Sequence, residues 1–140
     1  MKVLFICTGN TCRSPMAEGI FKEITKNVLP NIEIKSAGLM ANIGESVSEN
    51  AVVACKEYNV DISTHKAKQI TEELINSSDY FVCMTESHKQ ILINAGISEN
   101  IIYTLNVSDP YGGSLEIYKK CCKEIYDKLL MLKEKLMGSE

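Results

Sequence analysis

The feature that most constrains this chain is a short apolar run that leads directly into a polar loop. Residues 2–6 read KVLFI, whose β-branched and aromatic bias predicts a buried parallel strand. The loop CTGNTCRS follows at residues 7–14. Pro15 suits a first helical position, with Ser14 as the predicted N-cap, and apolar residues at helical spacing continue the pattern (Met16, Ile20, Phe21 and Ile24). A strand, a tight loop and a helix start are therefore expected in this order.

The loop at residues 7–14 has the composition of an anion-binding site. Unpaired N–H groups at a helix N-terminus and the helix dipole favour a tetrahedral oxyanion, and Gly9 allows close approach of the backbone. The same donors stabilise a thiolate on Cys7. Arg13 adds a planar fork that can hold two oxygens of a phosphoryl group. The combination predicts an enzyme with a thiol nucleophile.

Simpler interpretations exist for each of these residues alone. A free cysteine after a strand is often a small buried hydrophobe, and an arginine at a helix start is often solvated. Cys7 and Cys12 fall within the ligand spacing for zinc, but no second Cys or His pair with matching spacing occurs in the sequence. No metal and no other cofactor is therefore expected.

The loop resembles the phosphate loop of the low-molecular-weight protein tyrosine phosphatase family, with a thiol, five residues, an arginine and a hydroxyl. Further stretches match the family in order: SAG at 36–38, predicted to follow the second strand, STHKAKQIT at 63–71 and DPYG at 109–112. The resemblance implies that Cys7 attacks phosphorus to form a cysteinyl-phosphate, with assistance from Ser14. It further implies that Arg13 binds the phosphoryl group and that Asp109 protonates the leaving group and then activates water.

The resemblance also implies two sets of supporting residues. The phosphate-binding loop includes Thr8, Gly9, Asn10, Thr11, Cys12 and Ser14. A hydrogen-bond network that holds this loop in shape is expected from Asn10, Ser14, Ser36 and His65. Local chemistry leaves an alternative for Asp109, because Asp-Pro followed by Gly112 and Gly113 is a strong turn signal by itself. The other histidine, His88, is expected to be an ordinary packed or exposed residue.

The substrate prediction depends on Thr11 and on the residues after Asp109. Bacterial family members that resemble this chain and act on phosphoarginine have threonine in a CTGNTCRS loop, whereas tyrosine-directed members commonly carry a larger aliphatic residue there. Tyr111 is expected to wall the entrance, and Gly112 stands where those members place a second aromatic. We therefore expect hydrolysis of phosphoarginine in proteins. Phosphotyrosine stays the alternative, because one such contact discriminates by only about 1 to 3 kcal/mol.

Two other functions rank below these. Arsenate reduction in the family needs a second redox cysteine seven residues after Cys83, where this chain has Gln90. A non-catalytic phosphate-binding module would use the loop but has no use for a thiolate or a proton donor. Cys12 could trap Cys7 as a reversible disulfide under oxidation, with simple packing as the alternative.

Composition predicts the setting. A chain of 140 residues with 45% hydrophobic content is expected to form one domain over residues 1–140. No secretory or membrane-spanning segment is apparent, and six cysteines are then better interpreted as reduced thiols, so we expect a cytoplasmic protein. The net charge of −3 gives no reason to expect nucleic acid. Phosphorylated proteins are the expected partners of a monomer that does not bind membranes.

Apolar runs alternate with helical periods, which predicts an α/β protein. Strands are expected at residues 2–6, 32–35, 80–84 and 101–104. Helices are expected from Pro15, from about Ser46 with Glu49 completing a capping box, after Thr71, over 86–95 and from about Ser114. The last helix carries an apolar stripe that includes Cys121 and Cys122, so these thiols are expected in the core. The predicted architecture is a three-layer α/β/α fold with a four-stranded parallel sheet, flavodoxin-like, with catalytic loops at the carboxyl ends of the strands.

Overall fold

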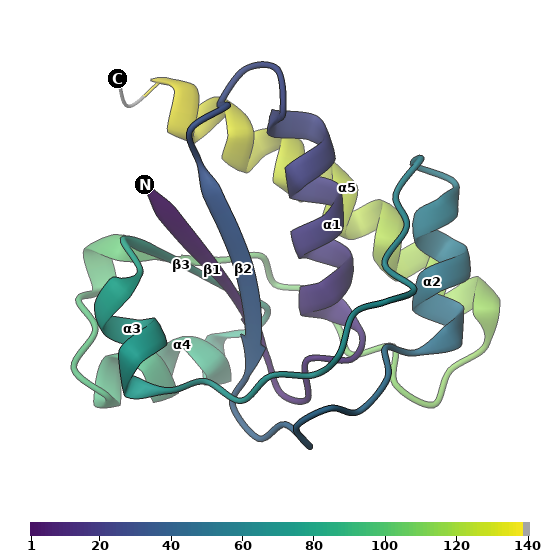
Figure 1. The fold of residues 1–140 in the computed structure, drawn as a ribbon, viewed down its shortest axis with the longest axis horizontal. Coiled ribbons are helices and arrows are strands. Elements are labelled where there is room, and N and C mark those ends of the chain that lie inside the picture. The colour runs from purple at the N-terminus through teal and green to yellow at the C-terminus, as the bar shows by residue number, and fades with distance from the viewer. Residues whose placement is uncertain (139–140) are drawn as a thin grey trace.

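The computed structural model describes residues 1–138, which form a four-stranded parallel sheet between two layers of helices (Figure 1). The order across the sheet is β2-β1-β3-β4, and all three strand pairs are parallel. The strands are β1 (Lys2–Cys7), β2 (Glu33–Gly38), β3 (Tyr80–Cys83) and β4 (Ile102–Thr104). The predicted three-layer α/β/α architecture is confirmed.

The helices divide between the two faces of the sheet (Figure 1). Alternate residues of β1 enter different cores: Val3 and Phe5 pack under the first helix layer, while Leu4 and Ile6 pack under the second. The first layer contains α1 (Arg13–Thr25), α2 (Glu49–Lys56) and α5 (Leu115–Gly138), and the second contains α3 (Glu72–Ser77) and α4 (Glu86–Asn94). No helix within residues 1–138 is long and apolar enough to cross a membrane.

The apolar stripe predicted on the last helix is buried along its whole length. Cys121 and Cys122 lie in the core with Ile125, Leu129 and Leu132. Cys122 also hydrogen-bonds the thiol of Cys55 on α2, and this contact together with burial raises the pKa of Cys55. The prediction that the vicinal pair is a packing element is confirmed.

Two predicted helix starts are wrong. Helix α1 begins at Arg13 with Cys12 at its N-cap, because the Ser14 hydroxyl is directed to Cys7 and Asn10 instead of to the helix N–H groups. Helix α2 begins at Glu49, so Ser46 forms no capping box. Residues 45–47 stay extended because they pair with residues 65–67, including a bridge between Ser46 and Lys66.

The strand ends also differ from the sequence prediction. Strand β2 continues through residues 36–38, because these residues pair with Phe5, Ile6 and Cys7 of β1. Strand β4 starts at Ile102, because a short 3₁₀ turn, η1 (Glu99–Ile101), takes up Ile101. The longer β2 brings Gly38 beside Cys7, at the edge of the sheet where the loop of residues 7–14 begins.

Helix α1 packs closely at Gly19 against the segment that follows α2. A Cβ at Gly19 would lie 2.7 Å from methyl groups of both Val60 and Ile62, whose β-branched side chains are stiff. Alanine normally favours a helix interior over glycine by about 1 kcal/mol. We expect Gly19→Ala to lower the free energy of unfolding by about 1–3 kcal/mol despite this gain, because overpacking dominates. Urea denaturation measures the change.

The matched control is Gly138→Ala in α5, where an added Cβ meets nothing within 4 Å. This control should leave the free energy of unfolding unchanged or slightly higher. A stabilising Gly19→Ala would contradict the close packing described for α1.

Candidate active site

The loop between β1 and α1 wraps around the sulfur of Cys7. The Ser14 hydroxyl lies 2.9 Å from Cys7 Sγ, and the backbone N–H of Asn10 donates to the same sulfur at 3.3 Å. Asn10 Nδ2 donates to Ser14 Oγ at 2.8 Å, which leaves the Ser14 hydroxyl proton free for the sulfur. These donors and the N-terminus of α1 direct partial positive charge at the sulfur.

Asn10 holds the loop in shape. Its φ of 57° is in the left-handed region, which asparagine tolerates better than most residues. Its side-chain amide uses its full hydrogen-bonding capacity: Nδ2 donates to Ser14 and Ser36, and Oδ1 accepts from the Lys68 backbone N–H and from His65 Nε2. The amide thus ties the loop to β2 and to the segment at residues 63–69.

The network continues from Ser36 to a buried carboxylate on α1. Ser36 Oγ donates to Glu18, which also accepts from Lys22 at 2.8 Å and lies 3.9 Å from His65 Nδ1. Burial lowers the pKa of His65, while its hydrogen bond to Asn10 and the Glu18 charge oppose the shift. The structure thus brings together Asn10, Ser14, Ser36 and His65, and it adds Glu18, which the sequence prediction missed.

Arg13 extends the site toward the loop that follows β4. Its Nη1 donates to the Val107 carbonyl at 2.9 Å, and its Nη2 lies 3.6 Å from Asp109 Oδ2. Arg13 Nε is buried and has no hydrogen-bond partner among the described residues. A buried donor of this kind needs an explanation, and an anion in the adjoining cavity is a suitable acceptor.

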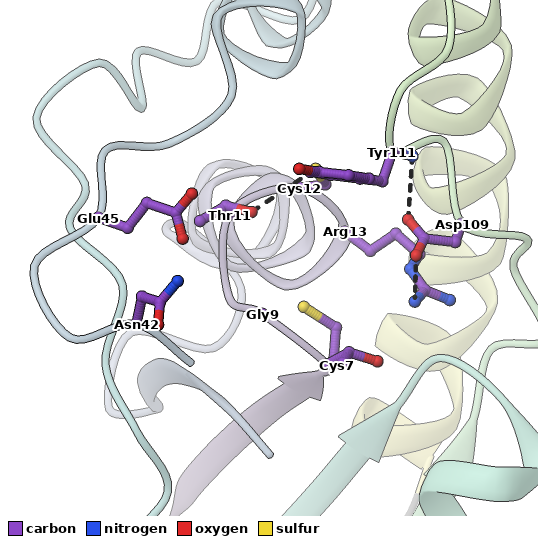
Figure 2. A pocket seen from close by; sticks show the side chains of 10 residues that line it. Cys7, Gly9, Thr11, Cys12, Arg13, Asn42, Glu45, Asp109 and Tyr111 are labelled. Atoms are coloured by element: carbon purple, nitrogen blue, oxygen red, sulfur yellow. Dashed lines mark hydrogen bonds and ion pairs between the residues drawn. The ribbon is translucent and has the colours of Figure 1, made fainter. Parts of the chain in front are cut away.

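A cavity of about 270 Å³ opens above Cys7 (Figure 2). Asn42 and Glu45 lie on one side of it, Arg13 and Asp109 lie on the other, and the sulfur of Cys7 lies between them. The other lining residues are Thr8, Gly9, Thr11, Cys12 and Tyr111. The sequence prediction missed Asn42 and Glu45. Both lie in the segment between β2 and α2, and no pattern in that segment indicated which of its residues would face the cavity.

Tyr111 and Asp109 stand together at the rim. The Tyr111 N–H donates to Asp109 Oδ1 at 3.0 Å, which fixes the carboxylate within the turn, and the side chain of Asp109 is 53% exposed. Tyr111 is 76% exposed and lines the cavity, so its ring is not held by core packing. The turn geometry expected from Asp-Pro is present, and the turn directs the carboxylate toward Arg13 (Figure 2).

Cys12 lies at the N-cap of α1 with its thiol buried. Its Sγ is 3.3 Å from the Tyr118 hydroxyl and 3.8 Å from Thr11 Oγ1. Burial raises the pKa of Cys12, and burial with the Cys12 contact raises the pKa of Tyr118 to about 12. Cys12 therefore stays a neutral thiol at physiological pH.

His88 on α4 also contacts the loop. Its Nε2 is 3.0 Å from Thr8 Oγ1, and the side chain is buried. Burial and the Arg13 charge lower the pKa of His88, so the imidazole is neutral at physiological pH. The expectation of an ordinary histidine did not foresee this contact, since Thr8 and His88 are 80 residues apart in the sequence.

Comparisons with known proteins agree with this geometry. The family described as low molecular weight phosphotyrosine protein phosphatase matches residues 2–139. The protein-arginine-phosphatase of Bacillus subtilis (strain 168) is 38% identical, with 97% of each chain covered. A crystal structure of a low molecular weight protein tyrosine phosphatase from T. tengcongensis is 43% identical with a TM-score of 0.91, covering 96% of this chain and 99% of that one.

A further solved structure is a C7S mutant of an arginine phosphatase with a phosphorylated active site serine. It is 37% identical to this chain with a TM-score of 0.90, and the match covers 97% of this chain and 95% of that one. The matches therefore extend over nearly the whole chain and include both tyrosine and arginine phosphatases. The chain belongs to the low molecular weight phosphotyrosine protein phosphatase family and is a protein phosphatase.

Proposed function

We propose that this phosphatase hydrolyses phosphoarginine in proteins through a cysteinyl-phosphate intermediate. The observation that carries the proposal is the cavity, which combines an anion-binding floor at Cys7 and Arg13 with carboxylates of Glu45 and Asp109 on opposite sides. A phosphorylated guanidinium group has the matching arrangement, with an anionic phosphoryl end and a delocalised cationic end. The reaction can be derived from the same residues.

In the first step, the Cys7 thiolate attacks phosphorus and the bond from phosphorus to the leaving atom breaks. The backbone N–H groups of the loop and the unpaired Nε of Arg13 are suited to hold the phosphoryl oxygens as charge develops on them. Asp109, in its protonated form, gives its proton to the leaving nitrogen or oxygen. The substrate protein leaves with a dephosphorylated arginine side chain, and Cys7 carries the phosphoryl group.

In the second step, the Asp109 carboxylate removes a proton from water, and the water oxygen attacks the phosphorus of the cysteinyl-phosphate. The sulfur–phosphorus bond breaks, inorganic phosphate is released, and the Ser14 hydroxyl stabilises the returning thiolate at 2.9 Å. A related arginine phosphatase has been captured with phosphate on the serine that replaces its residue 7, which supports covalent transfer to Cys7 here.

Thr11 and Glu45 support arginine as the leaving group. Thr11 lines the cavity and is smaller than the aliphatic residues typical of tyrosine-directed relatives, so a branched guanidinium has room beside it. Glu45 is exposed at the rim, and a carboxylate there attracts a cation but offers nothing to a neutral phenyl ring. Asp109 can pair with the guanidinium as well as transfer protons.

Phosphotyrosine is the second candidate. The tyrosine phosphatase from T. tengcongensis is more similar in sequence than the arginine phosphatases compared above. The exposed ring of Tyr111 could also stack on a phenyl leaving group at the rim. Arsenate reduction gains no support, since Cys83 is buried at the end of β3 and residue 90 is glutamine.

The setting of the reaction is part of the proposal. The described residues include six free cysteines, all buried, which suits a reducing compartment such as the cytoplasm. Phosphorylated proteins are the proposed substrates, and the site is assembled within one copy of the chain, so a monomer suffices for activity.

The substrate proposal is tested with matched phosphoarginine and phosphotyrosine peptides under reducing conditions. We expect wild type to have the higher kcat/KM for phosphoarginine. Thr11→Ile should lower that value about tenfold while sparing phosphotyrosine, because the larger side chain crowds the guanidinium. Cys7→Ser should release no phosphate from either peptide. A preference of wild type for phosphotyrosine would replace the arginine proposal with the second candidate.

Glu45→Gln tests whether the negative charge of the Glu45 carboxylate, apart from the size of the side chain, contributes to kcat/KM for phosphoarginine. The substitution keeps the size of the side chain and removes the carboxylate, so kcat/KM for phosphoarginine should fall about two- to fivefold, as for an exposed ion pair. Phosphotyrosine turnover should stay unchanged or rise. Glu49→Gln, on α2 and outside the residues that line the cavity, is the matched control. Equal losses on both substrates would remove Glu45 from the proposal.

Oxidation of the loop is a proposed means of reversible inactivation. Peroxide oxidises Cys7 to a sulfenic acid, and attack by the Cys12 sulfur then releases water and forms the Cys7–Cys12 disulfide. Peptide mass spectrometry after limited peroxide treatment should show this crosslink, and a thiol reductant should restore activity. In Cys12→Ser, the Cys7 sulfenic acid has no resolving thiol, so further peroxide should convert it to the irreversible sulfinic acid and less activity should return on reduction. Absence of the crosslink in inactivated wild type would rule out this mechanism.

A further inference from the structure

His88 is a buried polar side chain that the proposed chemistry does not use. It sits in the first turn of α4, and the Thr85 hydroxyl at the N-cap accepts from its backbone N–H at 3.3 Å. The cap fixes the start of the helix and therefore the position from which the imidazole extends. Because α4 follows β3, which pairs with β1, His88 reaches Thr8 from the helix layer that contains α3 and α4.

The contacts of His88 indicate which ring nitrogen carries the proton of the neutral imidazole. Its Nε2 is 3.0 Å from Thr8 Oγ1, whereas its Nδ1 is buried without a partner among residues 1–138. A buried N–H without an acceptor costs more than an unused lone pair. The proton of the neutral ring is therefore on Nε2, which donates to the Thr8 hydroxyl oxygen.

Thr8 is held on its other side by the backbone. Its carbonyl accepts from the Met40 N–H at 2.8 Å, and the neighbouring Cys7 carbonyl accepts from the Leu39 N–H at 2.9 Å. A Cβ on Gly38 would lie 2.7 Å from the Thr8 carbonyl oxygen, so the chain passes this point with no space to spare. The His88 contact adds a restraint on the same residue from α4, so that Thr8 is held from two directions.

We propose that His88 is a positioning residue of this phosphatase, whose bond to Thr8 aligns the peptide after Cys7 and thereby the sulfur for in-line attack on phosphorus. Thr8 follows Cys7 directly and begins the turn that leads to Asn10, whose N–H donates to Cys7 Sγ. Without the His88 bond, this peptide is held, within the described part of the chain, only by the backbone of residues 39 and 40 that follow β2, so the start of the loop can shift, which moves the nucleophile without removing any donor from the phosphate site. Small displacements of a nucleophile lower the rate of the chemical step far more than they weaken binding.

The inference rests on the proposed nucleophilic role of Cys7, but it holds for any leaving group. Para-nitrophenyl phosphate is therefore the substrate for the test, which keeps the outcome independent of the choice between arginine and tyrosine. If wild type is inactive or Cys7→Ser is active on this substrate, the proposed mechanism itself fails.

The test removes the bond from both ends. We expect His88→Leu and Thr8→Val each to lower kcat about tenfold with KM changed less than twofold, because the phosphate donors stay in place. The double variant should be no slower than the slower single variant, since both remove one interaction. His88→Gln places an amide N–H at a reach similar to that of Nε2 and should recover most of kcat.

The controls separate alignment from folding. Gln90→Ala is exposed on the same helix and should match wild type in both kcat and stability. Thr8→Val changes an exposed side chain, so it gives a folded protein for kinetics even if His88→Leu is unstable. Unchanged kcat in folded Thr8→Val, additive losses in the double variant, or a His88→Gln variant as slow as His88→Leu would each overturn the proposal.

Discussion

The side-chain amide of Asn10 is the interaction on which the rest of the site depends. Four hydrogen bonds saturate it, and together they hold a non-glycine residue in the left-handed region. This conformation turns the Asn10 N–H toward Cys7 Sγ, and the amide leaves the Ser14 hydroxyl free to donate to the same atom. The anion site is therefore preorganised by partners on β2 and the segment at 63–69. The hydrogen bonds to these partners offset the conformational strain of the loop.

Recognition in the cavity is divided by depth. Arg13 is almost fully buried, with one nitrogen bound to the Val107 carbonyl, so the fork cannot swing away from the floor. Asp109, Tyr111 and Glu45 are exposed and stand at the rim. Under the proposed function, the floor serves any phosphoryl substrate, while Thr11 and the rim distinguish the leaving groups. Val107 and Asp109 belong to one loop, and Arg13 contacts both of them. Arg13 therefore connects the floor of the cavity to the loop that carries Asp109 at the rim.

The sequence allowed accurate prediction of what depends on local pattern. The strands, the core stripe of the last helix and the loop of residues 7–14 have short-range signatures of apolar period or turn chemistry. The predicted helix starts at Ser14 and Ser46 were wrong, because tertiary partners took those hydroxyls and that backbone away from capping. Glu18, Glu45 and His88 were missed for a related reason. Their roles depend on contacts with residues distant in the sequence, and local sequence patterns do not predict such contacts.

The contacts that complete the loop come late in the chain. Asn10 bonds to residues 55 and 58 positions away, Thr8 to one 80 positions away and Arg13 to one 94 positions away. Bringing together residues so far apart in the sequence lowers the conformational entropy of the chain, and the contacts of the formed sheet must offset this cost. A chain that ends before Val107 therefore holds the whole sequence of the loop but lacks the carbonyl group that anchors Arg13. The surroundings of the thiol thus come from residues up to 68, whereas the anchor of the arginine comes from the last third of the chain.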